Sequence, residues 1–449
     1  PDTSKFIVHK VEPAQTLYSL ARKYNTTEQI ILDNNPEAKS GLKVGMELKI
    51  PIKIGSTQLP PDTLVVKRDT VFQTEMKDVY NVAMMMPLQL WNVSNINPDE
   101  IVANPPKSEF PQKPKAAVEF YEGALLAIDS IRKTGVKINV WVYDVDDLDS
   151  GKMGKVLGQS EFETMDLIIG PFSPGPFAEI VEFANANKIA IVSPVSASNR
   201  VLFKNPMAVK TLPSTITQME QLAAHISKER KEDNIIMISS GLPKEQKTGN
   251  AFRDEMNQLR VAEGKDSIRF TTGFSGVEAL LKKDKMNVIV IPSIAQAFVS
   301  DLLRNLHTLA EKYQITVYGM PSWMEFENLD PEYMQTLNMH FASPYYVDYD
   351  LPSTKRFIIR YRSAFGGDPT TYSFAGFDVT LFFLQQLVRG GTGFVSTITG
   401  VQGEGIQQSF SFVKSDAESG YENIGLRIIH ISDYELVPFG VENPVKDKR

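Results

Sequence analysis

Five histidines and a group of aspartates are the side chains of this sequence best suited to bind a metal or transfer protons. The histidines show neither metal-ligand spacing nor the helical HExxH pair: they are His9, His225, His307, His340 and His430. The aspartates follow an apolar run, but they lack the glycine at the sixth position and the spaced glutamate of a calcium loop: they are Asp144, Asp146, Asp147 and Asp149. We therefore predict no metal site and interpret the aspartates as solvated groups at a strand end.

Nucleophilic and phosphate-transfer chemistry also lack their usual residues. Cysteine is absent, which excludes disulfides, thiolate zinc sites and cysteine nucleophiles. The string GKMGKVLG at 151–158 lacks the terminal Lys-Ser/Thr pair of a phosphate-binding loop, and the sequence contains no nucleophile elbow. We predict no catalytic residue, no cofactor and no enzymatic activity.

Length and composition bound the organisation of the chain. With 449 residues, 42% of them hydrophobic, the chain can fill two or three cores. Its formal charge is -7, and both signs are spread along the sequence. No basic stripe results, so we predict no nucleic-acid partner. Because no run of about 18 apolar residues occurs, we also predict no transmembrane segment.

The first fifty residues predict a small module of strand, helix, helix and strand. Residues 6–11 alternate as a half-buried strand does. Thr16 can cap a first helix, and Thr26 with Gln29 forms the capping box of a second, which ends at Asn34 to Pro36. Residues 44–50 alternate again before Pro51.

The same segment resembles the LysM family over residues 5–52. The similarity lies in VEPAQTLYSLARKY, in NNP and in GLKVGMELKIP, and the sequence departs from the family at Ala14 and Gln15, where a Gly-Asp pair is usual. The resemblance implies binding of N-acetylglucosamine glycans in a groove between two loops. The groove residues it implies are Gln15, Thr16, Leu17, Asn35 and Pro36. The alternative is that Thr16 only caps its helix and Pro36 only ends the next.

Beyond this module, residues 54–78 read as an extended connector, because Pro60 and Pro61 and mixed charges occur without an amphipathic period. From residue 79 onward, apolar strands alternate with helices, which predicts parallel sheets. We expect strands at 82–86, 138–143, 167–169, 189–192, 234–238 and 287–291 and helices at 116–133 and 178–187. Residues 92–114 read as a long irregular loop, with Trp91 interpreted as a core residue.

Residues 79–440 resemble the type I periplasmic binding proteins, in particular the branch that binds branched-chain amino acids. The similarity lies in GALLAIDSI, INVWVYDVD, IIGPFSPG, IAIVSPVSASN and DPTTYSFAGFDVTLFFLQQL. It implies an α/β fold of two lobes, each a parallel sheet flanked by helices, joined by three crossovers. We expect the first lobe at about 79–210 and 345–420 and the second at about 211–344 and 421–449.

Ligands of open parallel sheets bind beyond the carboxyl ends of the strands. Two strand ends carry hydroxyls that fit this description, Ser173 after one strand and Ser196, Ala197 and Ser198 after another. The resemblance implies that they hold the carboxylate and amine of an amino acid, and simple helix capping is the alternative. In the second lobe, Thr248 stands beside Lys247 and Gly249 where a tyrosine is usual in the family, which argues against an amino-acid ligand.

These observations favour a non-enzymatic protein of the periplasm or outer cell envelope, exported by a signal outside this sequence. We expect the LysM segment to bind peptidoglycan or a related glycan, and the two-lobed segment to sense a small molecule or to scaffold an envelope protein partner. The alternative is the solute-binding component of an amino-acid ABC importer. A peptidoglycan hydrolase would need paired acids or a metal site, neither of which we identify.

Overall fold

The computed structural model describes residues 6–11, 28–40, 42–43, 45–51, 65–68, 76–93, 111–147, 151–414 and 418–439. By its internal contacts the chain divides into two compact units, Pro1–Pro61 and Asp62–Arg449.

The first unit contains two antiparallel strands and one described α-helix. β1 (Phe6–Lys10) pairs with β2 (Glu47–Pro51), while α2 (Glu28–Asn34) and the 3-10 helix η1 (Pro36–Ser40) lie between them in sequence. The core consists of buried aliphatic side chains from these elements and the loops beside them: Val11, Ile31, Ala38, Leu48 and Ile50. The two strands and the second helix agree with the sequence prediction, whereas the predicted first helix lies outside the described residues.

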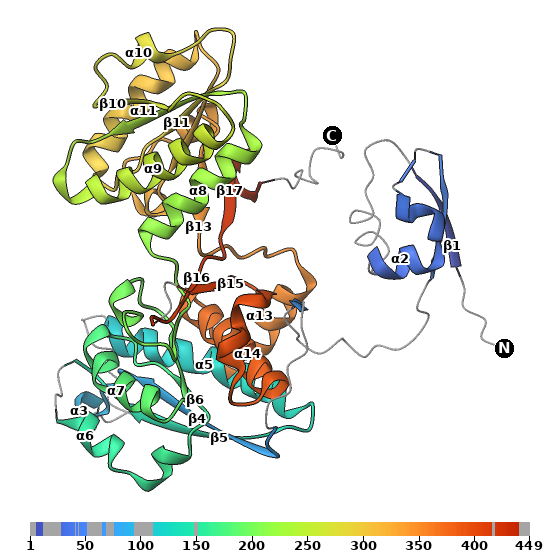
Figure 1. Cartoon of the computed structure of the whole chain (residues 1–449), viewed down its shortest axis with the longest axis vertical. Coiled ribbons are helices and arrows are strands. Elements are labelled where there is room, and N and C mark those ends of the chain that lie inside the picture. Colours follow the sequence, from blue (N-terminus) through green and yellow to red (C-terminus); the bar gives the residue numbers. More distant parts are fainter. Residues whose placement is uncertain are drawn as a thin grey trace. The chain divides into compact units, whose positions relative to one another are not determined.

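The second unit contains two sheets, each forming one lobe (Figure 1). The sheet of the first lobe has nine strands in the order β3-β14-β15-β16-β8-β7-β6-β4-β5. Its segment from β16 to β5 is parallel, and β3, β14 and β15 extend it antiparallel. The strands are β3 (Val65–Arg68), β4 (Val79–Met86), β5 (Lys137–Asp144), β6 (Leu167–Ile169), β7 (Ala190–Ser193), β8 (Ala208–Lys210), β14 (Val401–Glu404), β15 (Ser409–Lys414) and β16 (Tyr421–Asn423).

The sheet of the second lobe has seven strands in the order β10-β9-β11-β12-β13-β17-β18, parallel as far as β13 and antiparallel beyond it. In Figure 1 helices α8, α9 and α11 lie around these strands. The strands are β9 (Asn234–Ser239), β10 (Arg269–Thr272), β11 (Asn287–Val290), β12 (Ile315–Gly319), β13 (His340–Ser343), β17 (Arg427–Ser432) and β18 (Glu435–Pro438).

Helices cover the sheets of both lobes. Those of the first lobe are α3 (Leu90–Val93), α5 (Gln112–Arg132), α6 (Lys152–Leu157), α7 (Pro174–Ala186), α13 (Pro352–Phe365) and α14 (Thr371–Gly390). Those of the second are α8 (Thr215–Glu229), α9 (Gln246–Ala262), α10 (Val277–Leu280), α11 (Gln296–Ala310) and α12 (Pro331–Thr336). The strands that these helices cover read as continuous apolar runs because both faces are buried.

The contact between α5 and α14 is the closest helix packing of the first lobe, and it depends on glycine. A Cβ at Gly123 would lie 1.9 Å from the carbonyl oxygen of Ser373, and one at Gly376 would lie 1.9 Å from that of Phe120. The two backbones therefore approach at a distance that no other residue allows. Both helices contribute to the core against the sheet, so this approach holds the lobe together.

Three connections join the lobes, as the resemblance implied: residues 211–214, 344–351 and 424–426 lie between elements of different lobes. Arg427, which directly follows residues 424–426, links this connection and the connection 344–351 to the first lobe. Its Nη1 donates to the carbonyl oxygens of Tyr346 (2.6 Å) and Gln407 (3.2 Å), and its Nη2 lies 2.9 Å from a carboxylate oxygen of Glu404. The two-lobed α/β fold predicted from the sequence is confirmed.

Four details of the sequence prediction are corrected. The expected connector 54–78 contains β3, which pairs with β14, because antiparallel strands at the sheet edge accept one more partner. β16, expected in the second lobe, pairs with β8 of the first, since the crossover follows it. α5 begins at Gln112, inside the expected loop 92–114, because Pro114 is tolerated in a first helical turn. Trp91 is 53% exposed and not a core residue.

Candidate functional site

Ser173 lies at the carboxyl end of β6, at the amino end of α7. The turn before it depends on Gly170, whose φ is +98° and whose Cβ, if present, would lie 2.0 Å from the carbonyl oxygen of Met85. Ser173 is half-buried and is the N-cap residue of α7, but its hydroxyl makes no capping hydrogen bond. Ser173 thus lies after a strand end, a capping hydrogen bond of its side chain is not formed, and its contact with a ligand stays a prediction.

The segment Ser196 to Ser198 follows β7 and is held by hydrogen bonds within the first lobe. The Ser196 hydroxyl accepts from the backbone N–H of Ser198 (3.3 Å), and the Ser198 hydroxyl accepts from that of Arg200 (3.4 Å). The carbonyl oxygen of Ala197 accepts from the Lys210 ammonium (3.0 Å). For Ser198, helix capping is thus the observed role, at the start of η3 (Asn199–Val201).

A buried ion pair beneath this segment fixes it to the first crossover. The ammonium of Lys210 is fully buried and lies 2.8 Å from a carboxylate oxygen of Glu422, which also accepts from the backbone N–H of Ser214 (2.7 Å). Burial alone would raise the pKa of Glu422, but the charge of Lys210 and these hydrogen bonds hold that pKa below its ordinary value. The carboxylate therefore stays ionised inside the fold.

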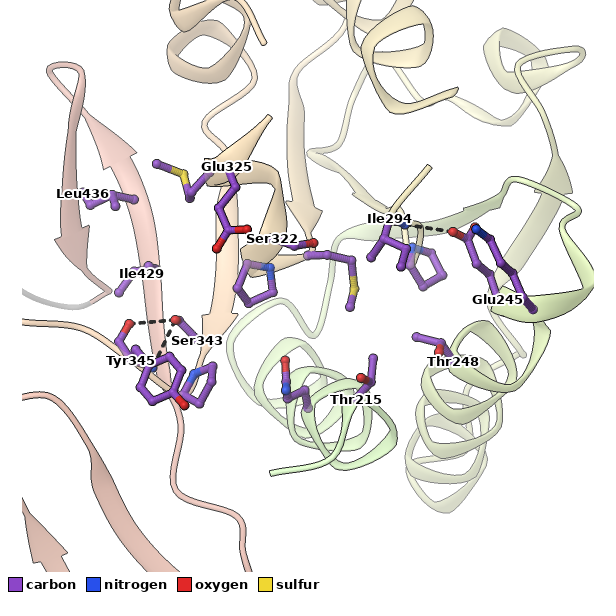
Figure 2. Close-up of a pocket in the computed structure, with 17 residues that line it drawn as sticks. Thr215, Glu245, Thr248, Ile294, Ser322, Glu325, Ser343, Tyr345, Ile429 and Leu436 are labelled. Atoms are coloured by element: carbon purple, nitrogen blue, oxygen red, sulfur yellow. Dashed lines mark hydrogen bonds between the residues drawn. The ribbon is translucent and has the colours of Figure 1, made fainter. Parts of the chain in front are cut away.

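Thr248 lies in a different place, in a pocket of the second lobe of about 600 Å³. The pocket opens at the carboxyl ends of β11, β12 and β13 and is shown in Figure 2. Its wall is mainly apolar, formed by side chains that follow these strands or lie on β17 and β18: Pro292, Ile294, Met320, Met324, Pro344, Ile429 and Leu436. Its size is that of a site for a drug-sized molecule or a short peptide segment.

Polar groups line this pocket in two classes. Glu245 and Ser343 are engaged within the fold: Glu245 accepts from the backbone N–H of Ile294 (3.0 Å), and the Ser343 hydroxyl donates to the carbonyl oxygen of Tyr345 (2.7 Å). Burial raises the pKa of Tyr345, so its phenol is neutral. These groups shape the pocket and are not offered to a ligand.

Ser322 and Glu325 form the second class. Both come from η5 (Pro321–Glu325) and stand on one wall, across from Thr215 and Thr248 (Figure 2). The Ser322 hydroxyl oxygen is buried without a hydrogen-bond partner. Within the described part of the chain, the exposed Glu325 carboxylate makes no hydrogen bond or ion pair within 4.0 Å. Because the exposed Glu325 carboxylate is negatively charged and accepts hydrogen bonds, this wall is suited to a ligand that carries hydrogen-bond donors.

The predicted ligand residues of the two lobes do not share the described second-lobe pocket. Thr248 lines the second-lobe pocket, whereas Ser173 and residues 196–198 do not. The sequence prediction missed Ser322 and Glu325, although they follow β12 directly and obey the same strand-end rule. The signal that could have found them is the apolar run ITVYG followed by MPSW.

In the first unit, Asn35 has a structural role that the sequence prediction did not foresee. Its side chain is 1% exposed and joins α2 to β2. The amide nitrogen donates to the carbonyl oxygens of Ile31 (2.7 Å) and Lys49 (2.9 Å), and the amide oxygen accepts from the backbone N–H of Lys49 (2.7 Å). These bonds give Asn35 a structural role, and its glycan contact stays a prediction. Pro36 is exposed beside it, and Gln15, Thr16 and Leu17 lie outside the described residues.

Asp378, the acid of the motif on α14, serves the fold in the same way. Its carboxylate is fully buried and accepts from the backbone N–H groups of Ile406 (2.8 Å), Gln407 (2.7 Å) and Gln408 (3.0 Å). Burial raises the pKa of this group to about 6, against the lowering effect of those hydrogen bonds. Asp378 thereby holds the loop 406–408. In this loop the carbonyl oxygen of Gln407 accepts from the backbone N–H of Tyr346 and from Arg427, which joins the loop to the connections between the lobes.

Within the described ranges, no group of three or more His, Asp or Glu side chains could hold a metal ion. None of the helices between residues 6 and 439 that the structure describes is both long and apolar enough to cross a membrane.

Comparisons with known proteins agree with both segments. The family model described as periplasmic binding protein matches residues 117–416, and the one described as LysM domain matches residues 9–51. Of the curated protein sequences, none matches this chain.

Solved structures show the same fold at low sequence identity. A protein described as a branched-chain amino acid ABC transporter from Rhodospirillum rubrum matches with a TM-score of 0.57 and 14% identity, over 80% of this chain and 100% of that one. Full-length LpoA from Haemophilus influenzae matches with a TM-score of 0.53 and 14% identity, over 81% of this chain and 59% of its own length. The LpoA C-domain, described as a regulator of PBP1A, gives 0.50 and 14%, over 80% and 99%.

Proposed function

We propose that this chain, which belongs to the periplasmic binding protein family and carries an N-terminal LysM domain, is a non-enzymatic protein of the cell envelope. In this proposal the LysM domain binds N-acetylglucosamine glycan of peptidoglycan. The two-lobed domain binds a protein partner through the pocket of the second lobe. The chain thereby positions its partner at the wall, in the periplasm or on the outer envelope.

The observation that carries this proposal is the composition of the second-lobe pocket. An amino-acid ligand needs hydrogen-bond donors for its carboxylate, and the serines expected for that task lie outside the pocket. The pocket instead offers an apolar wall, the carboxylate of Glu325 and the unpartnered hydroxyl of Ser322. Among the described residues that line it, Lys244, which is exposed, is the only cation. An apolar protein segment with a lysine, arginine or amide donor fits this lining better than a free amino acid does.

A regulatory role is supported by analogy with one protein of the same fold. The LpoA C-domain from Haemophilus influenzae is described as a regulator of PBP1A. We extend to this chain the general idea of a two-lobed domain that binds a partner protein. Within the proposal, Pro36 stays a glycan-contact residue together with Gln15, Thr16 and Leu17, and Ser173 and residues 196–198 stay candidates for a second contact on the first lobe.

Glycan binding is tested by sedimentation of the full chain with purified peptidoglycan. We expect the chain to pellet with peptidoglycan and to be released by a soluble tetramer of N-acetylglucosamine. A glucose tetramer at the same concentration is the control and should leave the pellet unchanged. Release by both sugars, or no pelleting at all, would contradict the proposed role of the LysM domain.

Pocket chemistry is tested with two blocked octapeptides, one alternating leucine with lysine and one alternating leucine with glutamate, by fluorescence anisotropy with the full chain. We expect the lysine peptide to bind at least about tenfold more tightly, since each lost charge-assisted hydrogen bond costs about 1.5–3 kcal/mol. Thr248→Trp, which fills the pocket, should abolish binding. Gln258→Trp, on the exposed side of the same helix α9, should not.

Free leucine tests the importer alternative in the same preparation. A ligand at about 100 times its dissociation constant stabilises the native state by about 2.7 kcal/mol, which is a shift of a few degrees in the unfolding temperature. We expect no such shift with millimolar leucine. A clear shift, together with equal binding of the two octapeptides, would replace the partner-binding proposal by a solute-binding one.

A further inference from the structure

A second pocket, of about 360 Å³, lies at the opposite edge of the second-lobe sheet. The residues that line it precede or begin strands: Asn234 begins β9, Arg269 begins β10 and Lys285 lies two residues before β11. The pocket with Thr248, in contrast, lies at the carboxyl ends of the same sheet. The two pockets are therefore separate sites, and this one lies away from the edge where open parallel sheets usually bind ligands.

Positive charge dominates this amino-edge pocket, although the whole chain has a formal charge of -7. Six cationic side chains line it, against three carboxylates, Glu232, Asp233 and Asp266. The cations are Lys231, Arg260, Lys265, Arg269, Lys282 and Lys285. They come from four separate stretches of sequence, which is why the sequence shows no basic stripe. Folding alone brings them together.

Four of these cations make no ion pair within 4.0 Å, as judged over the described ranges, and one of them, Lys285, donates instead to the carbonyl oxygen of Glu232 (2.8 Å). Arg260 donates through Nε to the carbonyl oxygen of Asp266 (2.7 Å), and Arg269 donates through Nη1 to that of Leu280 (3.1 Å). The terminal nitrogens of the Arg260 guanidinium and Nη2 of Arg269 thus keep donors available. The ammonium of the half-buried Lys282 makes no hydrogen bond within the described chain.

Compensation of helix dipoles explains only some of this charge. α8 ends at Glu229 and α9 ends at Ala262, so Lys231, Arg260 and Lys265 stand where cations stabilise helix ends. Lys265 also forms an ion pair with Glu263 (3.1 Å). Arg269, in contrast, is the first residue of a strand, and Lys282 follows only the single turn of α10. Neither the ion pairs nor the helix ends require these two cations in one pocket.

We propose that the amino-edge pocket binds a phosphate ester. A phosphate presents several oxygen acceptors and up to two negative charges, which matches two guanidinium groups and an ammonium around one cavity. Arg260 and Lys282 are half-buried, so their interaction with an anion is screened less than that of fully exposed cations. The volume is at the lower end of the range for ligand sites and suits a single phosphorylated unit.

The proposal is tested by ³¹P NMR titrations of inorganic phosphate and of glucose 1-phosphate with the full chain, at constant ionic strength set with chloride. We expect saturable line broadening on the native chain. The double variant Arg260→Gln/Arg269→Gln should weaken binding about a hundredfold, at about tenfold for each lost charge-assisted contact. The control Lys155→Gln/Lys312→Gln removes the same charge from exposed sites outside the pocket and should bind as the native chain does.

A third variant is used if the double variant does not fold. If Arg260→Gln/Arg269→Gln unfolds, Lys282→Gln takes its place, because the Lys282 ammonium contributes no hydrogen bond in the described chain and its loss should weaken binding about tenfold. Vesicles of phosphatidylglycerol, compared with phosphatidylcholine vesicles, distinguish the source of the phosphate. Binding only to phosphatidylglycerol, lost in the pocket variants, identifies a lipid headgroup, whereas binding of glucose 1-phosphate identifies a soluble ester.

Two results would overturn the proposal. One is the absence of saturable binding to the native chain in both the soluble and the vesicle experiments. The other is equal weakening in the pocket variants and in the Lys155→Gln/Lys312→Gln control, because that outcome would reflect the net charge of the chain and not the pocket. Either result would leave the second-lobe pocket at the carboxyl edge, and the partner proposed for it, unaffected.

Discussion

Acidification should destabilise the second lobe through a buried histidine on β13. His340 is 1% exposed, and its ring stacks on Tyr318 at 4.5 Å and on His430 at 5.3 Å between centroids. Burial lowers its pKa to about 3, and the nearby His430, Arg230 and His225 act in the same direction against a hydrogen bond to Asn338. The ring is therefore neutral in the fold at pH 5 and above.

The sign and size of the effect follow from the two states of His340. In the unfolded chain its pKa is the ordinary value of about 6.5, so below pH 6.5 the unfolded state binds one proton more than the folded state. Stability is unaffected above pH 6.5 and falls by about 1.4 kcal/mol per pH unit between pH 6.5 and 3. At pH 5 the loss from His340 is about 2 kcal/mol. His225 and His430, whose pKa values burial also lowers, add to it.

The assay is urea unfolding of the full chain and of His340→Phe at pH 7.5 and pH 5. Other groups also titrate in this range, so the informative quantity is the difference between the two proteins. We expect the advantage of the native chain to shrink by about 2 kcal/mol at pH 5, because the phenylalanine cannot bind a proton. Tyr318→Phe, in the same ring stack, is the control and should follow the native pH dependence. A native-minus-variant difference that stays constant within about 0.5 kcal/mol would refute the reasoning.

Three further predictions concern groups that the fold has buried. Lys210→Met should destabilise the chain by about 3–5 kcal/mol in urea unfolding, since it leaves Glu422 charged and buried, and Lys210→Met/Glu422→Leu should recover part of that loss. Asn35→Ala should lower the stability of the LysM unit by about 1–3 kcal/mol, seen as an earlier loss of peptidoglycan sedimentation on heating, while the two-lobed unit unfolds unchanged. Gly376→Ala should cost about 3 kcal/mol by forcing α5 and α14 apart, measured as a lower unfolding temperature, and an unaltered temperature would contradict the close approach.

Most of the architecture was predictable because its signals are local. Buried parallel strands are short apolar runs, so β6, β7 and β9 were expected within a few residues of their bounds. The edge strand β3 escaped prediction, since its four residues depend on pairing with β14, more than 300 residues away. A sequence pattern also cannot show whether the Asn35 side chain faces the interior of the module. In the structure its amide donates to carbonyl oxygens of α2 and β2.

The candidate sites were harder to predict, because each is assembled from several distant strand ends. The family resemblance pointed to Thr248, and the rule that ligands bind at carboxyl ends would have found Ser322 and Glu325 had β12 been recognised. No comparable rule covers the amino ends, where Arg260, Arg269 and Lys282 meet.

The difference between the two edges has a physical origin that also separates their ligands. At the carboxyl edge, helix N-termini point their free N–H groups toward the opening, so a pocket there can accept negative charge from the backbone itself. The second-lobe pocket instead places Glu325 at that edge, which favours a partner with donors. At the amino edge, helix C-termini present carbonyl oxygens and repel anions. An anion can bind there only where side chains outweigh the helix ends, and Arg269 and Lys282 supply the charge that the helix ends do not require.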